Sequence, residues 1–127
     1  MLFAVICYED EKAVSAWTKE EDDACLARLA VVHGAMKAKG KLGPVIRLHN
    51  TSKATTLRKN IDAPMVIDGP FAETKEHLLG FYIADCDTLE EAIAFAKDLA
   101  KANPGTGAYE IRPLSIFMPG DLVMPTA

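Results

Sequence analysis

Short apolar runs of four to seven residues recur along the chain and predict β-strands. Runs of this length that are rich in Val, Ile, Phe and Tyr are typical of strands, and the first run is apolar enough to be buried on both faces. The runs at 65–68 and 78–84 are separated by a polar loop, which predicts a hairpin with a long connection. The predicted strands are residues 2–8, 45–49, 65–68, 78–84 and 108–113, with a β-prone extension at 54–58.

Two further segments carry the three-to-four spacing of amphipathic helices. The first begins at Thr18, whose hydroxyl can form a capping box with Glu21, and it stops at Gly40, so residues 19–39 are predicted to be helical. The second begins near residues 87–91 and stops at 103–105. The expected inward stripe of the first helix is Leu26, Leu29, His33, Met36 and Gly40, and that of the second is Leu89, Ala92, Ile93, Ala96, Leu99 and Ala100.

The order of the elements is strand, helix, strand, strand, helix, strand, which predicts a ferredoxin-like βαββαβ sandwich of the α+β class. A chain of 127 residues has the length of one domain, so we expect a single domain over residues 1–127. With both helices on one face of the sheet, the other face would be apolar and uncovered. We therefore expect a homodimer packed sheet to sheet.

Charge and cysteine content narrow the range of partners. The chain has 14 basic and 18 acidic side chains, and this net charge of −4 does not favour nucleic acid or an anionic membrane as a partner. No apolar run approaches the ~20 residues that cross a bilayer, and no secretory signal is recognisable. The wide spacing of Cys7, Cys25 and Cys86 gives neither a disulfide framework nor a CxxC pair, so we expect a cytoplasmic protein.

The most distinctive stretch of the chain is DGPFAETKEHLLGFY at residues 68–82. It resembles the hallmark of the DGPF group of the YCII-related family, in which a DGPF turn and a charged run lead into a GF or GY strand. ATTLR at 54–58 is similar to the ATT-x-R segment of that family, and HGAM at 33–36 is similar to its HGAF-like helical turn. The resemblance extends from residue 2 to about residue 114. It implies a dimeric α/β barrel built from the ferredoxin-like fold.

The same resemblance implies a pocket pair, a histidine on the first helix and the aspartate of the DG turn, which here are His33 and Asp68. An aspartate that accepts from one imidazole nitrogen fixes the tautomer and lets the other nitrogen exchange a proton near neutral pH. We expect the two side chains to meet at the rim of a cleft between the first helix and the DGPF turn. The sequence departs from the family pattern at Arg47, where a small residue is common.

Structural interpretations stay open beside the functional ones. His33 could be a core histidine whose nitrogens are satisfied by neighbours, and Asp68 suits a tight turn whatever its chemistry. Glu73 and Lys75 could position a ligand, but charges on a loop are usually solvated or paired across a subunit boundary. Arg58 could bind an anion or simply face solvent.

Two functions follow from these observations. The first is a cofactor-free acid–base enzyme, of isomerase, lyase or dehydrochlorinase-like chemistry, that uses His33 and Asp68 on a small organic substrate. The alternative is a non-catalytic dimeric small-molecule-binding or accessory module linked to transcription regulation, because relatives occur beside sigma-factor-like proteins. Oxygenase chemistry is a third option by fold analogy alone. The histidines lack metal-ligand spacing and no phosphate-binding loop is present, so we expect no metal and no cofactor.

Overall fold

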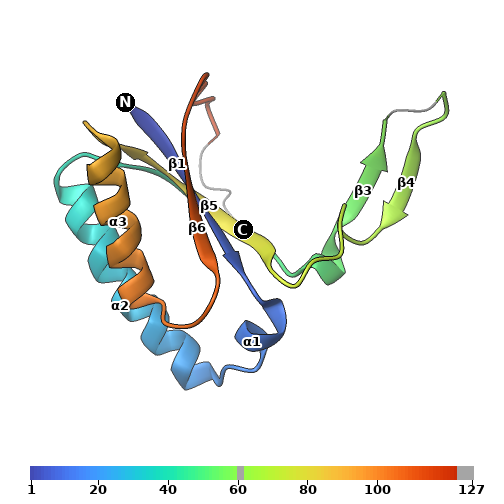
Figure 1. The fold of residues 1–127 in the computed structure, drawn as a ribbon, viewed down its shortest axis with the longest axis horizontal. Coiled ribbons are helices and arrows are strands. Elements are labelled where there is room, and N and C mark those ends of the chain that lie inside the picture. The colour runs from blue at the N-terminus through green and yellow to red at the C-terminus, as the bar shows by residue number, and fades with distance from the viewer. Residues whose placement is uncertain (60–61, 123–127) are drawn as a thin grey trace.

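Two helices cover one face of a four-stranded antiparallel sheet, and a separate two-stranded ribbon extends from the sheet (Figure 1). This computed structural model describes residues 1–59 and 62–122. In chain order the elements are β1 (Leu2–Glu9), α1 (Glu11–Ser15), α2 (Lys19–Ala38), β2 (Leu42–Arg47), the 3₁₀ helix η1 (Thr51–Lys53), β3 (Thr55–Arg58), β4 (Met65–Asp68), β5 (His77–Asp85), α3 (Leu89–Ala102) and β6 (Ala108–Pro113).

The order of strands in the main sheet is β2-β5-β1-β6. β1 pairs antiparallel with both β5 and β6, and β2 pairs antiparallel with β5 at the edge. This is the strand order of the ferredoxin-like split βαβ fold, with the ribbon inserted between its second and third strands. The predicted fold class is confirmed. Over the described residues of one chain the sheet is open, so the dimeric barrel stays a prediction.

Helix α2 begins where the sequence predicts it. The Thr18 hydroxyl accepts from the Glu21 amide at 3.1 Å, and the Glu21 carboxylate accepts from the Thr18 amide at 3.2 Å, which completes the capping box. Gly40 follows the helix with a φ of 69°, the left-handed conformation that ends helices. The predicted inward stripe is buried at Met36, whereas Leu26 lies on the same side of the helix but lines an open pocket and is 44% exposed.

The hydrophobic core lies between the two long helices and the sheet. Along one row of the sheet, Val45, Tyr82, Val5 and Ile111 pair in register, and Phe95 and Leu99 of α3 pack with this face. Because successive residues of a strand point to opposite faces, the next row faces away from the helices. That row consists of Ile46, Phe81, Ile6 and Glu110.

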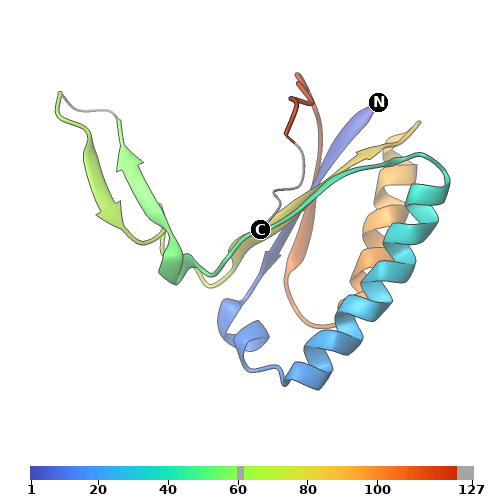
Figure 2. The ribbon, with the colours of Figure 1, turned by 180° about the vertical axis from the view of Figure 1, so that it is seen from behind.

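The predicted hairpin of residues 65–68 with 78–84 is wrong. β4 pairs instead with β3, from Thr55 opposite Asp68 to Arg58 opposite Met65, while β5 pairs with β1 and β2. β5 lies between β2 and β1 in the main sheet, so both of its edges are already paired and neither is open to β4. The β3–β4 ribbon points away from α2 and α3 in both views (Figures 1 and 2).

Candidate functional site

A pocket of about 240 Å³ lies between α2 and the sheet face that this helix covers. Most of its wall is apolar, and the polar side chains come from different elements. Its charged lining residues are Asp22 and Arg47, and its uncharged polar side chains include His33, Tyr82, Tyr109 and Asn103. α1, which was not predicted from the sequence, adds Val14 to the wall, and the turn between α1 and α2 adds Trp17.

Gly80 sets how closely β2 approaches β5 beside this pocket. A Cβ atom at this position would lie 2.1 Å from the carbonyl oxygen of Ile46, so a side chain here would push β2 away. Gly80 pairs in register with Arg47, and two residues further along β5 stands Tyr82. The period of two along the strand places Tyr82 and Arg47 on the face that the helices cover.

His33 and Tyr82 form the polar centre of the pocket. The His33 Nε2 atom lies 3.0 Å from the Tyr82 hydroxyl oxygen, and the two ring centroids are 5.2 Å apart. Tyr82 in turn meets Phe95 edge to face, with centroids 5.6 Å apart, which fixes the tyrosine ring. Burial lowers the pKa of His33 and raises the pKa of Tyr82, so both side chains are neutral near pH 7.

The two cysteines that line the pocket are thiols rather than thiolates. Burial raises the pKa of Cys7 to about 12, and burial also raises the pKa of Cys25. The Cys25 Sγ atom lies 3.5 Å from the Asn103 Oδ1 atom and 3.6 Å from the Ala102 carbonyl oxygen. Burial is also the main cause that raises the pKa of Tyr109. The interior of the pocket is therefore polar in places but uncharged.

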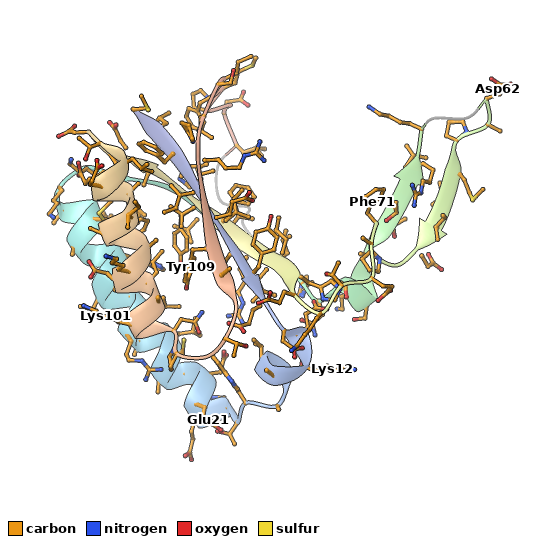
Figure 3. The ribbon with its side chains drawn as sticks, in the orientation of Figure 1. Lys12, Glu21, Asp62, Phe71, Lys101 and Tyr109 are labelled. Carbon is orange, nitrogen blue, oxygen red and sulfur yellow. The ribbon has the colours of Figure 1, made fainter. Side chains whose placement is uncertain are left out.

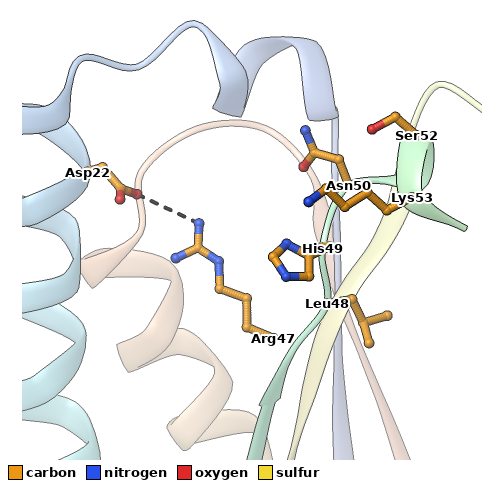
Figure 4. A pocket seen from close by; sticks show the side chains of 7 residues that line it. All are labelled: Asp22, Arg47, Leu48, His49, Asn50, Ser52 and Lys53. Carbon is orange, nitrogen blue, oxygen red and sulfur yellow. Dashed lines mark ion pairs between the residues drawn. The ribbon is translucent and has the colours of Figure 1, made fainter. Parts of the chain in front are cut away.

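The charges stand at one side of the pocket, where Asp22 of α2 faces Arg47 of β2. An Asp22 carboxylate oxygen lies 3.8 Å from an Arg47 guanidinium nitrogen. The same two side chains also line an open cleft of about 540 Å³, which continues along η1 (Figure 4). The remaining walls of the cleft are Leu48, His49, Asn50, Ser52 and Lys53.

The structure does not bring Asp68 to the His33 pocket. Asp68 is exposed at the end of β4, and the ribbon lies on the side of the molecule away from α2. The DG turn has a structural task there: the Gly69 amide donates to the Ala54 carbonyl at 2.8 Å, and the Thr56 hydroxyl donates to the Gly69 carbonyl at 2.8 Å. The expected meeting of His33 and Asp68 at a cleft beside the first helix is therefore not found in the single chain, because the inserted ribbon carries the turn away.

The other predicted ligand-binding residues also lie outside this pocket. Arg58 of β3 is exposed, and its guanidinium carbon lies 4.7 Å from the ring centroid of Phe71, which is labelled beside the ribbon in Figure 3. Glu73 and Lys75 are exposed in the loop between β4 and β5. None of these three residues lines the pocket around His33, and their role in binding stays a prediction.

A second histidine cluster, which the sequence did not indicate, lies where the ribbon joins the body. Glu11 of α1 accepts from the Thr51 amide at 2.9 Å and the Thr51 hydroxyl at 2.6 Å, and these hydrogen bonds lower the pKa of Glu11. The His77 Nδ1 atom lies 3.4 Å from Glu11. Within residues 1–59 and 62–122 neither ring nitrogen of this histidine has a hydrogen-bond partner.

Over the same two described ranges, no three His, Cys, Asp or Glu side chains come together as metal ligands would. Neither range contains a helix with the length and apolar character that crossing a membrane requires.

Comparison with known proteins agrees with the DGPF resemblance. The sequence model of the YCII-related domain matches residues 1–117. An uncharacterized protein of Rhizobium meliloti (strain 1021) is 55% identical to this chain over 122 residues, which are 96% of this chain and 98% of that protein.

Proposed function

We propose that this chain, which belongs to the YCII-related family, binds a small organic molecule in the pocket between α2 and the sheet and exchanges a proton with it through His33. One observation carries the proposal. The His33 imidazole is held 3.0 Å from the Tyr82 hydroxyl inside a largely apolar pocket of about 240 Å³. Pockets that combine apolar walls with a few convergent polar groups are the usual sites of small-molecule binding.

The pair supports His33 as the general base and Tyr82 as a positioning residue. If Nε2 carries the hydrogen and donates to the Tyr82 oxygen, the Nδ1 lone pair is free to accept a proton. The lowered pKa of His33 makes the imidazole a weaker base but keeps it in the neutral, proton-accepting form near pH 7. This arrangement suits an isomerisation or an elimination that begins with removal of a proton.

A non-catalytic binding module is the second candidate. It is favoured by the position of Asp68, which leaves the pocket without the carboxylate that was expected to orient His33. In the opposite tautomer the Tyr82 hydroxyl donates to Nε2 and Nδ1 carries the hydrogen, so His33 would be a satisfied pocket histidine and not a base.

The ring opening of 5-nitrobenzisoxazole distinguishes the two candidates. In this reaction the base takes the ring C–H proton, the N–O bond breaks, and a coloured cyanophenolate is released. If His33 is the base, the protein accelerates the reaction and His33→Gln loses about 100-fold of the rate, in the range of general-base effects. His49→Gln tests the rival base, because His49 stands in the wall of the neighbouring open cleft and outside the pocket. If His33 is the base, this variant keeps the rate of the wild-type protein.

Binding is measured on the same probe by the shifts of the His33 ring signals in NMR spectra. Shifts of these signals without any acceleration over free imidazole would support the binding module against the enzyme. Absence of both effects, for this probe and for a series of aromatic acids and ketones, would contradict the proposed pocket function.

A further inference from the structure

The His33 pocket and the neighbouring open cleft share two wall residues, Asp22 and Arg47. The pocket is mostly apolar and uncharged inside, whereas the cleft is lined mainly by polar and basic side chains. A molecule that extends from the inner volume of about 240 Å³ into the cleft passes beside Arg47. Figure 4 shows the Arg47 side chain reaching toward Asp22, with His49 and Asn50 on the other side of the cleft.

We propose that the ligand of this pocket is an amphipathic carboxylate, and that its carboxylate replaces Asp22 as the partner of Arg47. The inference rests on the proposed function, because it assigns the class of molecule that the His33 pocket takes. The apolar body of the ligand lies beside His33 and Tyr82, and its anionic end lies in the cleft.

The present partner of Arg47 is well suited to being replaced. The closest approach of Asp22 is 3.8 Å, which is longer than a hydrogen bond, and the Arg47 side chain is 63% exposed. Exposed ion pairs of this kind contribute little stability because water and salt screen them. A guanidinium can bind a ligand carboxylate through two parallel hydrogen bonds, which the longer contact to Asp22 does not provide.

The charge of the cleft also favours an anion. Its walls contain two permanent cations, Arg47 and Lys53, and one carboxylate, Asp22. The local excess is positive although the whole chain has a net charge of −4. A cleft with an excess of one sign of charge raises the local concentration of ligands with the other sign. The single excess charge matches a carboxylate better than a doubly charged phosphate.

The test compares 3-phenylpropionate with its neutral amide, two ligands that share one apolar body. Binding is followed by the shift of the His33 ring signals, so that occupation of the inner pocket is seen directly. We expect the carboxylate to bind about tenfold more tightly than the amide, the effect of one charge-assisted contact. Arg47→Gln should reduce this preference to less than about twofold, and Arg47→Lys should leave an intermediate preference because lysine keeps the charge without the fork.

Asp22→Asn should act in the opposite direction. Removal of the competing anion should strengthen carboxylate binding by about threefold without changing amide binding. Lys97→Gln on α3 is the control for loss of one positive charge away from the cleft. Equal binding of acid and amide, with shifts at His33, would overturn this inference and leave the proposed function standing. Tighter binding of phenyl phosphate than of the carboxylate would also overturn it. If neither phenylpropionate nor its amide moves the His33 signals, both proposals fail.

Discussion

Val5 and Ala84 of the four-stranded sheet are fully buried beneath the helices, whereas Leu57 and Val66 of the β3–β4 ribbon are 60% and 66% exposed. Both regions are made of strands rich in apolar side chains. In the main sheet the two long helices cover one face, whereas among the described residues each strand of the ribbon pairs only with the other. A two-stranded ribbon is marginally stable on its own in water.

The difference in burial between the two regions shows that strand formation and coverage by a second layer have separate causes. Apolar β-prone residues are enough to form a strand, but the topology decides whether a second layer covers it. The ribbon is an insertion between β2 and β5. Helices α2 and α3 pack against the main sheet, so neither of them covers the ribbon. The DGPF turn lies with this uncovered region, and the His33 pocket lies in the covered one.

The largest contrast should appear when a leucine is truncated in each region. Leu99→Ala in α3 removes a fully buried side chain, and we expect the free energy of unfolding to fall by about 2–5 kcal/mol. Leu57→Ala in β3 removes an exposed one and should cost about 0.5 kcal/mol or less. Urea denaturation of both variants measures the difference. Similar losses for the two variants would show that the ribbon is covered as well as the core is.

A second copy of the chain is the cover that we expect for the face opposite the helices. Light scattering should then give about twice the chain mass of 13.8 kDa at micromolar concentration. Ile46, in the row with Phe81 and Ile6, is 38% exposed, and Ile46→Glu should weaken the dimer by about 2 kcal/mol or more. Val31→Glu on the exposed surface of α2 is the matched control. A wild-type chain that stays monomeric would contradict this expectation and the barrel together.

Contact between strands within the main sheet can be tested at Gly80. The Cβ atom of Gly80→Ala would lie 2.1 Å from the Ile46 carbonyl oxygen, so β2 must move and we expect a loss of about 1–3 kcal/mol. Gly34→Ala in α2 is the control, because among the described residues no atom outside the local helix backbone lies within 4 Å of the added Cβ atom. That variant should gain about 0.5–1 kcal/mol from helix propensity. A neutral Gly80→Ala would mean that β2 is less closely held than the structure has it.

Local signals predicted most of the fold. The capping box at Thr18 and Glu21 and the glycine stop at Gly40 involve residues a few positions apart, so the sequence contains all that they require. The partner of a strand is not local information. Residues 65–68 were correctly predicted as a strand and wrongly paired, because β-propensity does not indicate which neighbour a strand will find.

The same distinction between local and non-local information applies to the candidate site. The helical stripe correctly placed His33 toward a cleft, but its partner depends on how β5 packs against α2. Tyr82 was within the DGPF stretch and was not singled out. The period of two from Gly80 to Tyr82 is the signal that could have found it, since both then face the helices. Nothing local indicated that an inserted ribbon would separate Asp68 from His33.

The smallest effect that we expect is a pH dependence of stability at His33. Burial places the pKa of His33 in the folded state below its ordinary value of 6.5. The unfolded chain therefore binds a proton at a higher pH than the folded chain, and stability should fall as the pH drops below about 6.5. His33→Gln should flatten the dependence of the unfolding free energy on pH below about 6.5. His49→Gln, at an exposed position, is the matched control.

The direction of the His33 pKa shift also tests whether the β3–β4 ribbon of one copy meets the His33 pocket of another in a dimer. A His33 titration above 6.5, followed by NMR at concentrations where the dimer forms, would contradict burial as the controlling influence. It would require a carboxylate close to the imidazole, since a nearby negative charge favours the protonated ring. Asp68→Asn would then identify the source: if it returned the titration of His33 to below 6.5, the ribbon of a second copy would be supplying the partner that the single chain holds away.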